Sequence, residues 1–380
     1  MLNNILETPL SKCTGCSACQ SACSLGAISM KLNANGFYEP LLSENLCVKC
    51  GKCLKACPIG KASSNNRISS YYGCHTDPEV LYQSTSGGAF RALAGKVLER
   101  HGVVYGALYN DDYSEVLFSS SDSEDLTKFQ KSKYIVSNPE AIYKSIKEQL
   151  DAERFVLFSG APCQVAGLTC YLNGKYDKLI TVDFVCGGMP SLRFWQEHKC
   201  FLEKKYKSKI ISVDFRSKRH GWGKGYLDIQ FSNGKQYFKR DFLDSYYHCF
   251  CDEHISVRSS CLTCAFHDNH FSDITIADFW GYGNVGVSDV SKGVSLLVAN
   301  SQKGDSLIQD THDFHATLLD NRYSDYALHK STPTEEELNR NLAFFTLSEK
   351  IGFEKAARAM CPATVLAHIK QYVKLKLKHR

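Results

Sequence analysis

The sequence contains 18 cysteines, and eight of them lie before residue 60 in two sets of four. Both sets have the spacing C-x2-C-x2-C-x3-C, and the second repeats the first 34 residues later, which indicates an internal duplication. Three cysteines spaced in this way can wrap a loop around three irons of one 4Fe-4S cubane, while the fourth points away and completes the other cubane. The expected ligands of the first cluster are Cys13, Cys16, Cys19 and Cys57, and those of the second are Cys47, Cys50, Cys53 and Cys23.

Zinc does not suit these eight cysteines. Structural zinc sites take four ligands in two pairs, whereas each set here is a single run of four. Chance does not produce such a run twice in register. Gly15 and Gly51 suit a loop that turns tightly around sulfur, and Ser24 stands where Pro58 stands in the second half. This region, to which we assign residues 1–62, resembles a bacterial two-cluster ferredoxin.

Four further cysteines could hold a third cubane if the fold brings them together. Cys163 and Cys186 each follow an apolar run that predicts a strand, and open α/β sheets bind ligands at the carboxyl ends of their strands. The other two form the pair Cys261-x-x-Cys264. A zinc ion on Cys261, Cys264, His267 and His270 is an alternative, although all four lie within ten residues.

The remaining cysteines fall into two groups. Buried free cysteines are common in proteins, and this is the interpretation for Cys74, Cys170, Cys200 and Cys361. Cys249 and Cys251 lie near enough to the C-x-x-C pair in the sequence to serve as substitute ligands.

Glycine-rich and basic segments suggest several further sites. Residues 84–88, Ser-Thr-Ser-Gly-Gly, precede a predicted helix and could offer backbone N–H groups to a phosphate, although an ordinary helix cap looks the same. Residues 132–134 are, by themselves, a polar turn.

The run from Gly281 to Gly286 matches G-x-G-x-x-G, but a strand rather than a helix is expected after it, which argues against a dinucleotide site. The basic residues 370–380 could touch anionic lipid or a partner, or form a solvated helix end.

Periodicity predicts a mixed α and β fold, with features of both the α/β and the α+β classes. Apolar runs predict strands at 102–108, 155–158, 180–185, 210–215, 226–231, 274–277 and 294–300. Helical spacing occurs at 90–100 and 139–149, and Asn233–Gly234 supplies a hairpin turn. We expect a ferredoxin-like domain at 1–62, a linker at 63–72, a larger domain at 73–330 with parts at 73–152 and 153–330, and a helical segment at 331–380.

Composition narrows the class of protein. The chain has 380 residues and a net charge of +5, which is too mild to favour nucleic-acid binding. No apolar run is long enough to span a membrane, and no signal peptide is visible at the N-terminus. Cysteines in such a chain bind metal or do redox chemistry more often than they form disulfides, so a reducing cytoplasmic setting is expected.

Taken in order, the motifs of residues 70–330 resemble one family, the coenzyme F-420 hydrogenase/dehydrogenase beta subunit family, here with a ferredoxin domain in front. The matching motifs are Ser86-Gly87-Gly88, Ser132-Lys133-Tyr134, Gly160-Ala-Pro-Cys163-Gln164, Cys186-Gly-Gly-Met-Pro-Ser191, Phe215-Arg216-Ser-Lys218-Arg-His-Gly221-Trp222, Cys261-x-x-Cys264 and Asp273-Ile-Thr-Ile-Ala-Asp278-Phe-Trp-Gly281. The resemblance implies a large flavin-binding domain with FAD and a third 4Fe-4S cluster beside it.

The resemblance also assigns residues to these groups. The third cluster would be held by Cys163, Cys186, Cys261 and Cys264. The flavin would lie among Ser86, Gly87, Gly88, Ser132, Lys133, Tyr134, Arg216, Gly221 and Trp222. Three positions depart from the family: Ala161 replaces a common Thr, Gly187 a common His, and Ala277 a Gly. The missing His argues against assuming the family's deazaflavin substrate.

The expected function is that of an FAD-dependent iron–sulfur oxidoreductase. Electrons would pass between a ferredoxin-like protein and a small substrate at the flavin, and similar fusions occur in bacterial surface-polysaccharide gene sets. The alternative is a non-catalytic electron-transfer subunit of a larger redox complex.

Overall fold

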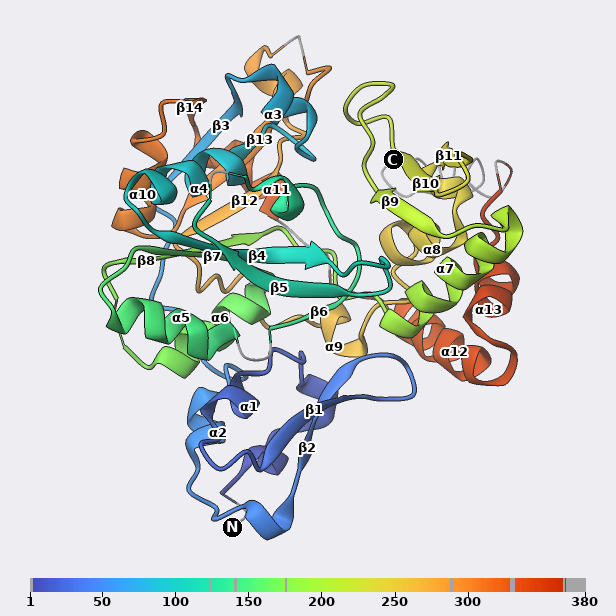
Figure 1. Ribbon diagram of the computed structural model, residues 1–380, viewed down its shortest axis with the longest axis horizontal. Coiled ribbons are helices and arrows are strands. Elements are labelled where there is room, and N and C mark those ends of the chain that lie inside the picture. Colours follow the sequence, from blue (N-terminus) through green and yellow to red (C-terminus); the bar gives the residue numbers. More distant parts are fainter. Residues whose placement is uncertain are drawn as a thin grey trace.

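A computed structural model describes residues 3–123, 125–139, 142–174, 176–287, 290–328, 332–364 and 366. The basic residues 370–380 lie outside this range. Within it, the chain forms a small N-terminal unit below a large mixed sheet, with a helical region beside that sheet (Figure 1). Among the described residues, no helix has both the length and the apolar character that crossing a membrane requires.

The N-terminal unit repeats its elements in step with its cysteines. The turn η2 (Leu10–Lys12) and helix α1 (Ala18–Ala22) recur as η3 (Glu44–Leu46) and α2 (Lys52–Ala56). Between them, β1 (Ile28–Leu32) pairs antiparallel with β2 (Tyr38–Leu42), and η1 (Ile5–Glu7) precedes the first repeat. The backbone is left-handed at equivalent positions of both loops, with positive φ at Gly15, Ser17, Lys49 and Gly51. The two repeats therefore share their backbone conformation as well as their cysteine spacing.

The large sheet has nine strands in the order β14-β3-β13-β12-β8-β7-β4-β5-β6. Its middle strands, β12, β8, β7 and β4, run parallel to one another, and the strands beyond them are mostly antiparallel. The strands are β3 (Ser69–His75), β4 (Val103–Tyr109), β5 (Val116–Ser121), β6 (Ser137–Asn138), β7 (Val156–Ser159), β8 (Leu179–Phe184), β12 (Ile274–Asp278), β13 (Ser295–Ala299) and β14 (Phe314–Leu319).

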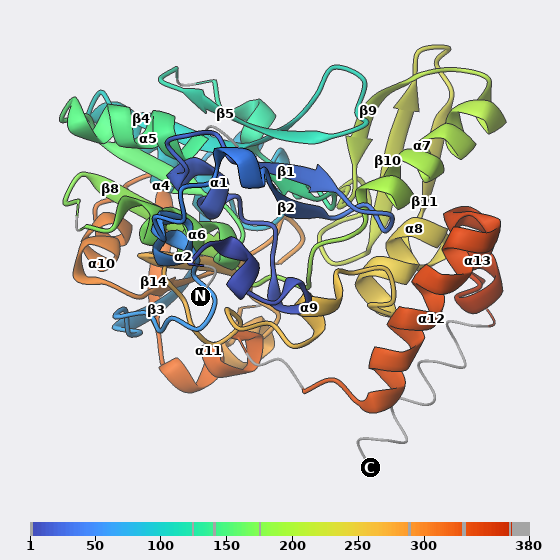
Figure 2. The same cartoon turned by 90° about the horizontal axis from the view of Figure 1, so that it is seen from below.

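Helices cover both faces of this sheet. On one face, α4 (Ala89–Glu99) and α10 (Gln302–Gln309) pack apolar side chains onto the strands. On the other face, α5 (Ile142–Asp151) and α6 (Pro162–Leu172) do the same. Shorter elements at the edges are α3 (Pro78–Tyr82), η4 (Thr127–Phe129), η7 (Tyr282–Val285) and α11 (Asn321–Leu328). The N-terminal unit lies below α6 in Figure 1 and in front of it in Figure 2, and α6 contacts both α1 and α2.

A helical region with its own small sheet stands beside the large sheet. The antiparallel strands β9 (Ile210–Asp214), β10 (Tyr226–Phe231) and β11 (Gln236–Arg240) pack with α7 (Leu192–Tyr206). After η5 (Asp241–Leu243) come α8 (Ser245–Tyr247), the π-helix η6 (His248–Asp252) and α9 (Ser259–Leu262). The C-terminal helices α12 (Glu335–Ile351) and α13 (Phe353–Met360) close this region.

The expected fold class is confirmed, and each of the seven expected strands is present. The hairpin of β10 and β11 turns at Asn233–Gly234, where Gly234 has a φ of +78°. No helix follows the run from Gly281 to Gly286 in the described chain, since η7 leads on to β13. One boundary differs from expectation: the linker predicted at 63–72 ends inside β3, which pairs with β13 and β14.

A buried charged cluster holds the C-terminal helices to the rest of the helical region. The Nε2 atom of His198 lies 2.9 Å from the Asp244 carboxylate, and its Nδ1 atom contacts Glu354 on α13. Burial by itself would lower the pKa of His198, but the two carboxylates raise it from 6.5 to about 10. His198 is therefore a buried cation between two anions.

We predict that His198→Gln destabilises the protein in a pH-dependent way. Because the folded state raises the pKa of His198, its contribution is fully present below about pH 6.5 and is lost as the pH rises through about 10. Breaking a buried pair costs about 3–5 kcal/mol, so the thermal transition of the variant should fall well below that of the wild type at pH 6. The difference between the transition temperatures of wild type and variant should narrow toward pH 10. The exposed His312→Gln is the matched control, and parallel curves for wild type and His198→Gln would contradict the assignment.

Candidate iron–sulfur centres and cofactor cavity

The first cysteine set gathers around one cavity of the N-terminal unit. Cys13, Cys16, Cys19 and Cys57 all line it, together with Thr14 and Met30 among others. The positive φ of Gly15 turns the loop so that its N–H donates to Cys13 Sγ at 3.4 Å. Burial raises the pKa of Cys16 to about 12, so a thiolate there needs the positive charge of bound iron. The donor set and its loop fit a 4Fe-4S cluster.

The second cysteine set lies nearer the surface. Cys23 and Cys53 pack in one small apolar cluster, and the N–H of Ala27 donates to Cys23 Sγ at 3.3 Å. Burial and the neighbouring Cys47 raise the pKa of Cys53. Cys50 is exposed. The structure thus places Cys23 and Cys47 near Cys53 and leaves Cys50 facing solvent.

The third cysteine set comes together from three distant parts of the chain. Cys163 lies in the first turn of α6 after β7, and Cys186 follows the neighbouring parallel strand β8, so both stand at the same edge of the sheet. Cys261 lies on α9 and Cys264 just beyond it. All four line one cavity. Backbone N–H groups of Gly188, Met189 and Phe266 lie 3.4 Å from the sulfurs of Cys186, Cys261 and Cys264, respectively.

These N–H···S contacts fit a metal cluster. Backbone donors stabilise the charge on cluster sulfurs and set the potential of the cluster. Burial, reinforced by Cys261 and Cys186, raises the pKa of Cys163 well above its ordinary value, so this thiol also needs a bound cation to ionise. Arg258 connects the third set to the first, since its guanidinium donates to the backbone oxygen of Cys13 at 3.0 Å.

The single-ion zinc alternative finds no support in the geometry. His267 and His270 do line the third cavity, and their Nδ1 atoms pair with Asp268 and Asp183, respectively. Within the described chain, one group of three or more potential ligand atoms lies within 4.8 Å of one another, and it is His248, Glu253 and Cys361. The substitute ligands also lie elsewhere: Cys249 is next to Cys361, and Cys251 is next to Tyr247.

The first and third cavities adjoin each other. Thr14 lines both of them. Gly167 on α6 faces Cys16, and a methyl group at Gly167 would lie 3.0 Å from Cys16 Sγ. The charge of Cys16 also contributes to the raised pKa of Cys163. Two cysteine sets from separate parts of the chain are therefore in near contact.

A larger cavity of about 400 Å³ adjoins the third one. Its walls are the start of α4, residues 129–137, the loops that follow β7 and β8, and the end of β12. Val185, Cys186, Gly188 and Met189 line both this cavity and the third one. The volume is within the range of small-molecule and cofactor sites.

Six of the nine residues expected to bind flavin line this large cavity: Ser86, Gly88, Ser132, Lys133, Tyr134 and Arg216. The other three are not among the residues that line it. Gly87 fits between strands, where a methyl group would lie 2.4 Å from the carbonyl oxygen of Gly73. Trp222 stacks on Trp280 with ring centroids 4.4 Å apart, and Trp280 itself lines the cavity. Gly221, with a φ of +93°, belongs to the same loop as Trp222.

The charged groups of the cavity are held by partners. Arg216 pairs with Asp278 at 2.9 Å and donates to the Tyr134 hydroxyl at 3.1 Å. Lys133 Nζ donates to the Gln130 carbonyl oxygen at 2.7 Å, and burial lowers the pKa of Lys133 to about 7. The helix α4 begins at Ala89, and its N-cap residue Gly88 offers no side-chain cap, so the first N–H groups of the helix are available to an anion at the cavity wall.

Sequence reasoning assigned no role to Lys218. Its Nζ is buried and donates to three backbone oxygens, including those of Ser86 and Lys292 at 2.6 and 2.5 Å. Burial lowers the pKa of Lys218 to about 7. The residue therefore holds the loop that carries Ser86 in place, and its signal in the sequence is its position in the motif that includes Arg216.

Comparison with known proteins gives two family matches. Residues 153–319 match the model for the C terminus of the coenzyme F420 hydrogenase/dehydrogenase beta subunit, and residues 12–61 match the model of a 4Fe-4S dicluster domain. A solved structure of the F420-reducing [NiFe] hydrogenase complex from Methanosarcina barkeri contains a similar chain, with 17% identity and a TM-score of 0.48. The similarity covers 76% of this chain and 94% of that one. No curated protein matches.

We predict that Cys163→Ser removes one cluster and leaves the others. The variant should lose about four irons per chain, because only the third cysteine set includes residue 163. Cys170→Ser, on the same helix, is the matched control, since it lines none of the three cavities and should keep its iron. Iron analysis and electron paramagnetic resonance of reduced samples measure the effect. Equal iron in both variants would remove Cys163 from the ligand set.

Proposed function

We propose that this chain, in which a 4Fe-4S dicluster domain precedes the C-terminal domain of a coenzyme F420 hydrogenase/dehydrogenase beta subunit, is an FAD-dependent iron–sulfur oxidoreductase. The observation that carries the proposal is the row of adjoining cavities. The cavity of the first cysteine set touches that of the third at Thr14, and the third touches the large cavity at Cys186 and Met189. Groups held in this row would lie in sequence from the N-terminal unit to the large sheet.

Each cysteine set would hold one cluster, and clusters carry single electrons while a flavin exchanges one or two. The chain itself would supply the cysteine ligands of the clusters, set the spacing between the cluster cavities and limit their exposure to solvent. Gly167 allows α6 to approach Cys16, and Arg258 ties the Cys13 loop to the segment that carries Cys261. Cys163 is buried and Cys16 is half-buried, so the side chains at the junction between the two cavities have little contact with solvent.

For FAD, we assign the large cavity and the six predicted residues that line it. The uncapped start of α4 and the Ser86 loop would face the pyrophosphate, since glycines there leave the backbone accessible. Arg216 would donate to the polar edge of the flavin ring from its place between Asp278 and Tyr134. Trp280, braced by Trp222, would offer an aromatic face.

The outer cysteine set marks the side where a protein partner would dock. Cys50 is exposed, and so are the neighbouring apolar side chains of Leu46 and Val48, with 52% and 68% exposure. A ferredoxin-like donor or another component of a redox complex suits this surface.

At the other end of the row of cavities, a small substrate would bind beside the flavin. Position 187, where the family commonly has His, is Gly in this chain and provides no imidazole there. The substrates of surface-polysaccharide metabolism are our candidates.

A non-catalytic electron-transfer subunit is the second candidate, and one observation favours it. Asp278 is the only carboxylate among the described residues that line the large cavity, and it is paired with Arg216. No described acid or base there is left without a partner for proton transfer to a substrate. Turnover of any substrate by the isolated chain with an artificial donor would exclude this candidate.

Cofactor content provides the first test of the proposal. The chain, expressed without oxygen, should contain about twelve irons, about twelve acid-labile sulfides and about one FAD. All three are measured on one sample by elemental analysis, colorimetry and extraction. About eight irons with FAD would remove the third cluster. About eight irons without flavin would refute the flavoprotein assignment.

We further predict that Arg216→Gln weakens FAD binding. A hydrogen bond to a charged group is worth about 1.5–3 kcal/mol, so loss of the guanidinium should weaken binding by about ten- to a hundredfold. Arg219→Gln, in the same loop but directed at Asp228 on β10, should leave binding unchanged. Titration of flavin-depleted protein with FAD gives both affinities. Iron content should be equal in the two variants, which separates a flavin effect from misfolding.

A further inference from the structure

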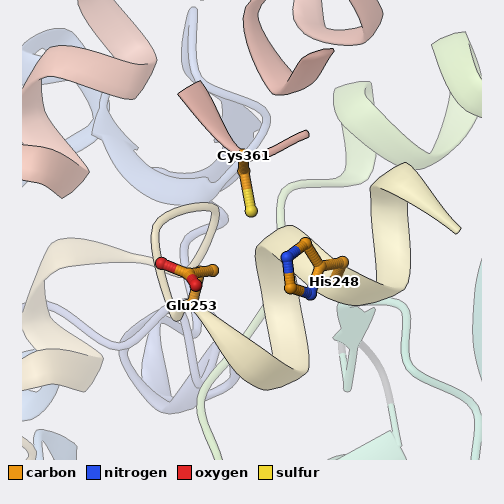
Figure 3. Close-up of side chains that lie close together, drawn as sticks. All are labelled: His248, Glu253 and Cys361. Atoms are coloured by element: carbon orange, nitrogen blue, oxygen red, sulfur yellow. The ribbon is translucent and has the colours of Figure 1, made fainter. Parts of the chain in front are cut away.

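Three potential metal ligands meet at the C-terminal helices, away from all the cavities described above. One ligand atom each from His248, Glu253 and Cys361 lies within 4.8 Å of the other two (Figure 3). His248 and Cys361 are buried, with 3% and 2% exposure. A sulfur, an imidazole nitrogen and a carboxylate oxygen at this spacing form the donor set that zinc prefers.

The π-helix η6 creates this arrangement. In an α-helix, residues five apart point about 140° away from each other, so His248 and Glu253 would diverge. Here the N–H of Glu253 donates to the carbonyl oxygen of His248 at 3.0 Å, the i to i+5 bond of a π-turn. The wider turn brings both side chains to one side, and π-turns are frequent at functional sites.

The surrounding residues orient these ligands as in a metal site. His248 Nδ1 pairs with Asp252 at 2.6 Å, which leaves Nε2 for a metal ion, and a carboxylate behind a ligating histidine is the usual arrangement. Arg340 on α12 holds Glu253 Oε2 at 2.6 Å and leaves Oε1 free of that ion pair. Cys249, which is fully buried, contacts Cys361 and is a further potential donor.

We propose that His248, Glu253 and Cys361 bind a structural zinc ion, with Cys249 as the fourth ligand. The thiolate of Cys361 and the carboxylate of Glu253 would balance the charge of Zn²⁺. Because Cys361 ends α13 while His248 and Glu253 belong to η6 and its end, the ion would fasten the C-terminal segment to the body. This site shares no residue with the cysteine sets or the large cavity, and the proposal does not depend on the proposed function.

The test compares zinc content in cluster-loaded full-length protein. After incubation with zinc sulfate and gel filtration, wild type should retain about one Zn²⁺ per chain, and Cys361→Ala should retain none. Cys200→Ala is the control, because Cys200 is exposed and does not belong to this group, and it should match wild type. Iron content should be the same in all three. Zinc at equal levels in wild type and Cys361→Ala would overturn the proposal.

A second measurement does not rely on variants that fold poorly. Titration of wild type with cobalt(II) should produce the intense absorption of tetrahedral cobalt–thiolate bonds, and zinc should abolish it. Glu253→Gln, which keeps an oxygen for Arg340, should weaken cobalt binding without unfolding the chain. No thiolate band, or a Cys249–Cys361 disulfide found by mass spectrometry in protein purified without oxygen, would also overturn the proposal.

Discussion

The close approach of α6 to the N-terminal unit is the constraint on which the rest of the structure depends. At Gly167 the helix lies so near to Cys16 that a methyl group would be 3.0 Å from its sulfur. The same helix carries Cys163 in its first turn, where Tyr143 donates to the carbonyl oxygen of Gln164 at 2.7 Å. One rigid element therefore fixes the distance between two cysteine sets. A larger residue at position 167 would require the helix or the Cys16 loop to shift, because interiors are close-packed.

The cysteine spacing was sufficient to predict a ferredoxin-like N-terminal unit, because the duplicated run requires two loops that turn around sulfur. The two strands between the runs were not predicted. Alternating apolar runs likewise located seven strands. The Ser/Asn-rich composition before Tyr71 misled the linker assignment, since β3 obtains its stability from pairing with β13 and β14, which are over two hundred residues away. Such tertiary pairing overrides local propensity and leaves no local signal.

The functional sites, too, could be predicted from the sequence only in part. Cys163 and Cys186 could be placed at one sheet edge from sequence, because both follow strands. Their meeting with Cys261 depends on Arg258, whose backbone N–H donates to the carbonyl oxygen of Met189 at 2.9 Å, a contact that no spacing encodes. Lys218 and Trp280 belong to matching motifs but received no role from the sequence, for a related reason. They act by bracing Ser86 and Trp222, so their role becomes visible only when the neighbours are known.

The π-helix η6 connects the cofactor region with the C-terminal helices. Phe250 lines the large cavity and lies 5.4 Å from the ring of Tyr134, which accepts a hydrogen bond from Arg216. His248 and Cys249, on the same short element, face Cys361 instead. Since buried elements move as rigid units, a shift of the C-terminal segment would displace Phe250 and the wall that holds Arg216. Fixing this segment, whether by the His198 ion pairs or by a metal ion, therefore preserves the shape of the cavity.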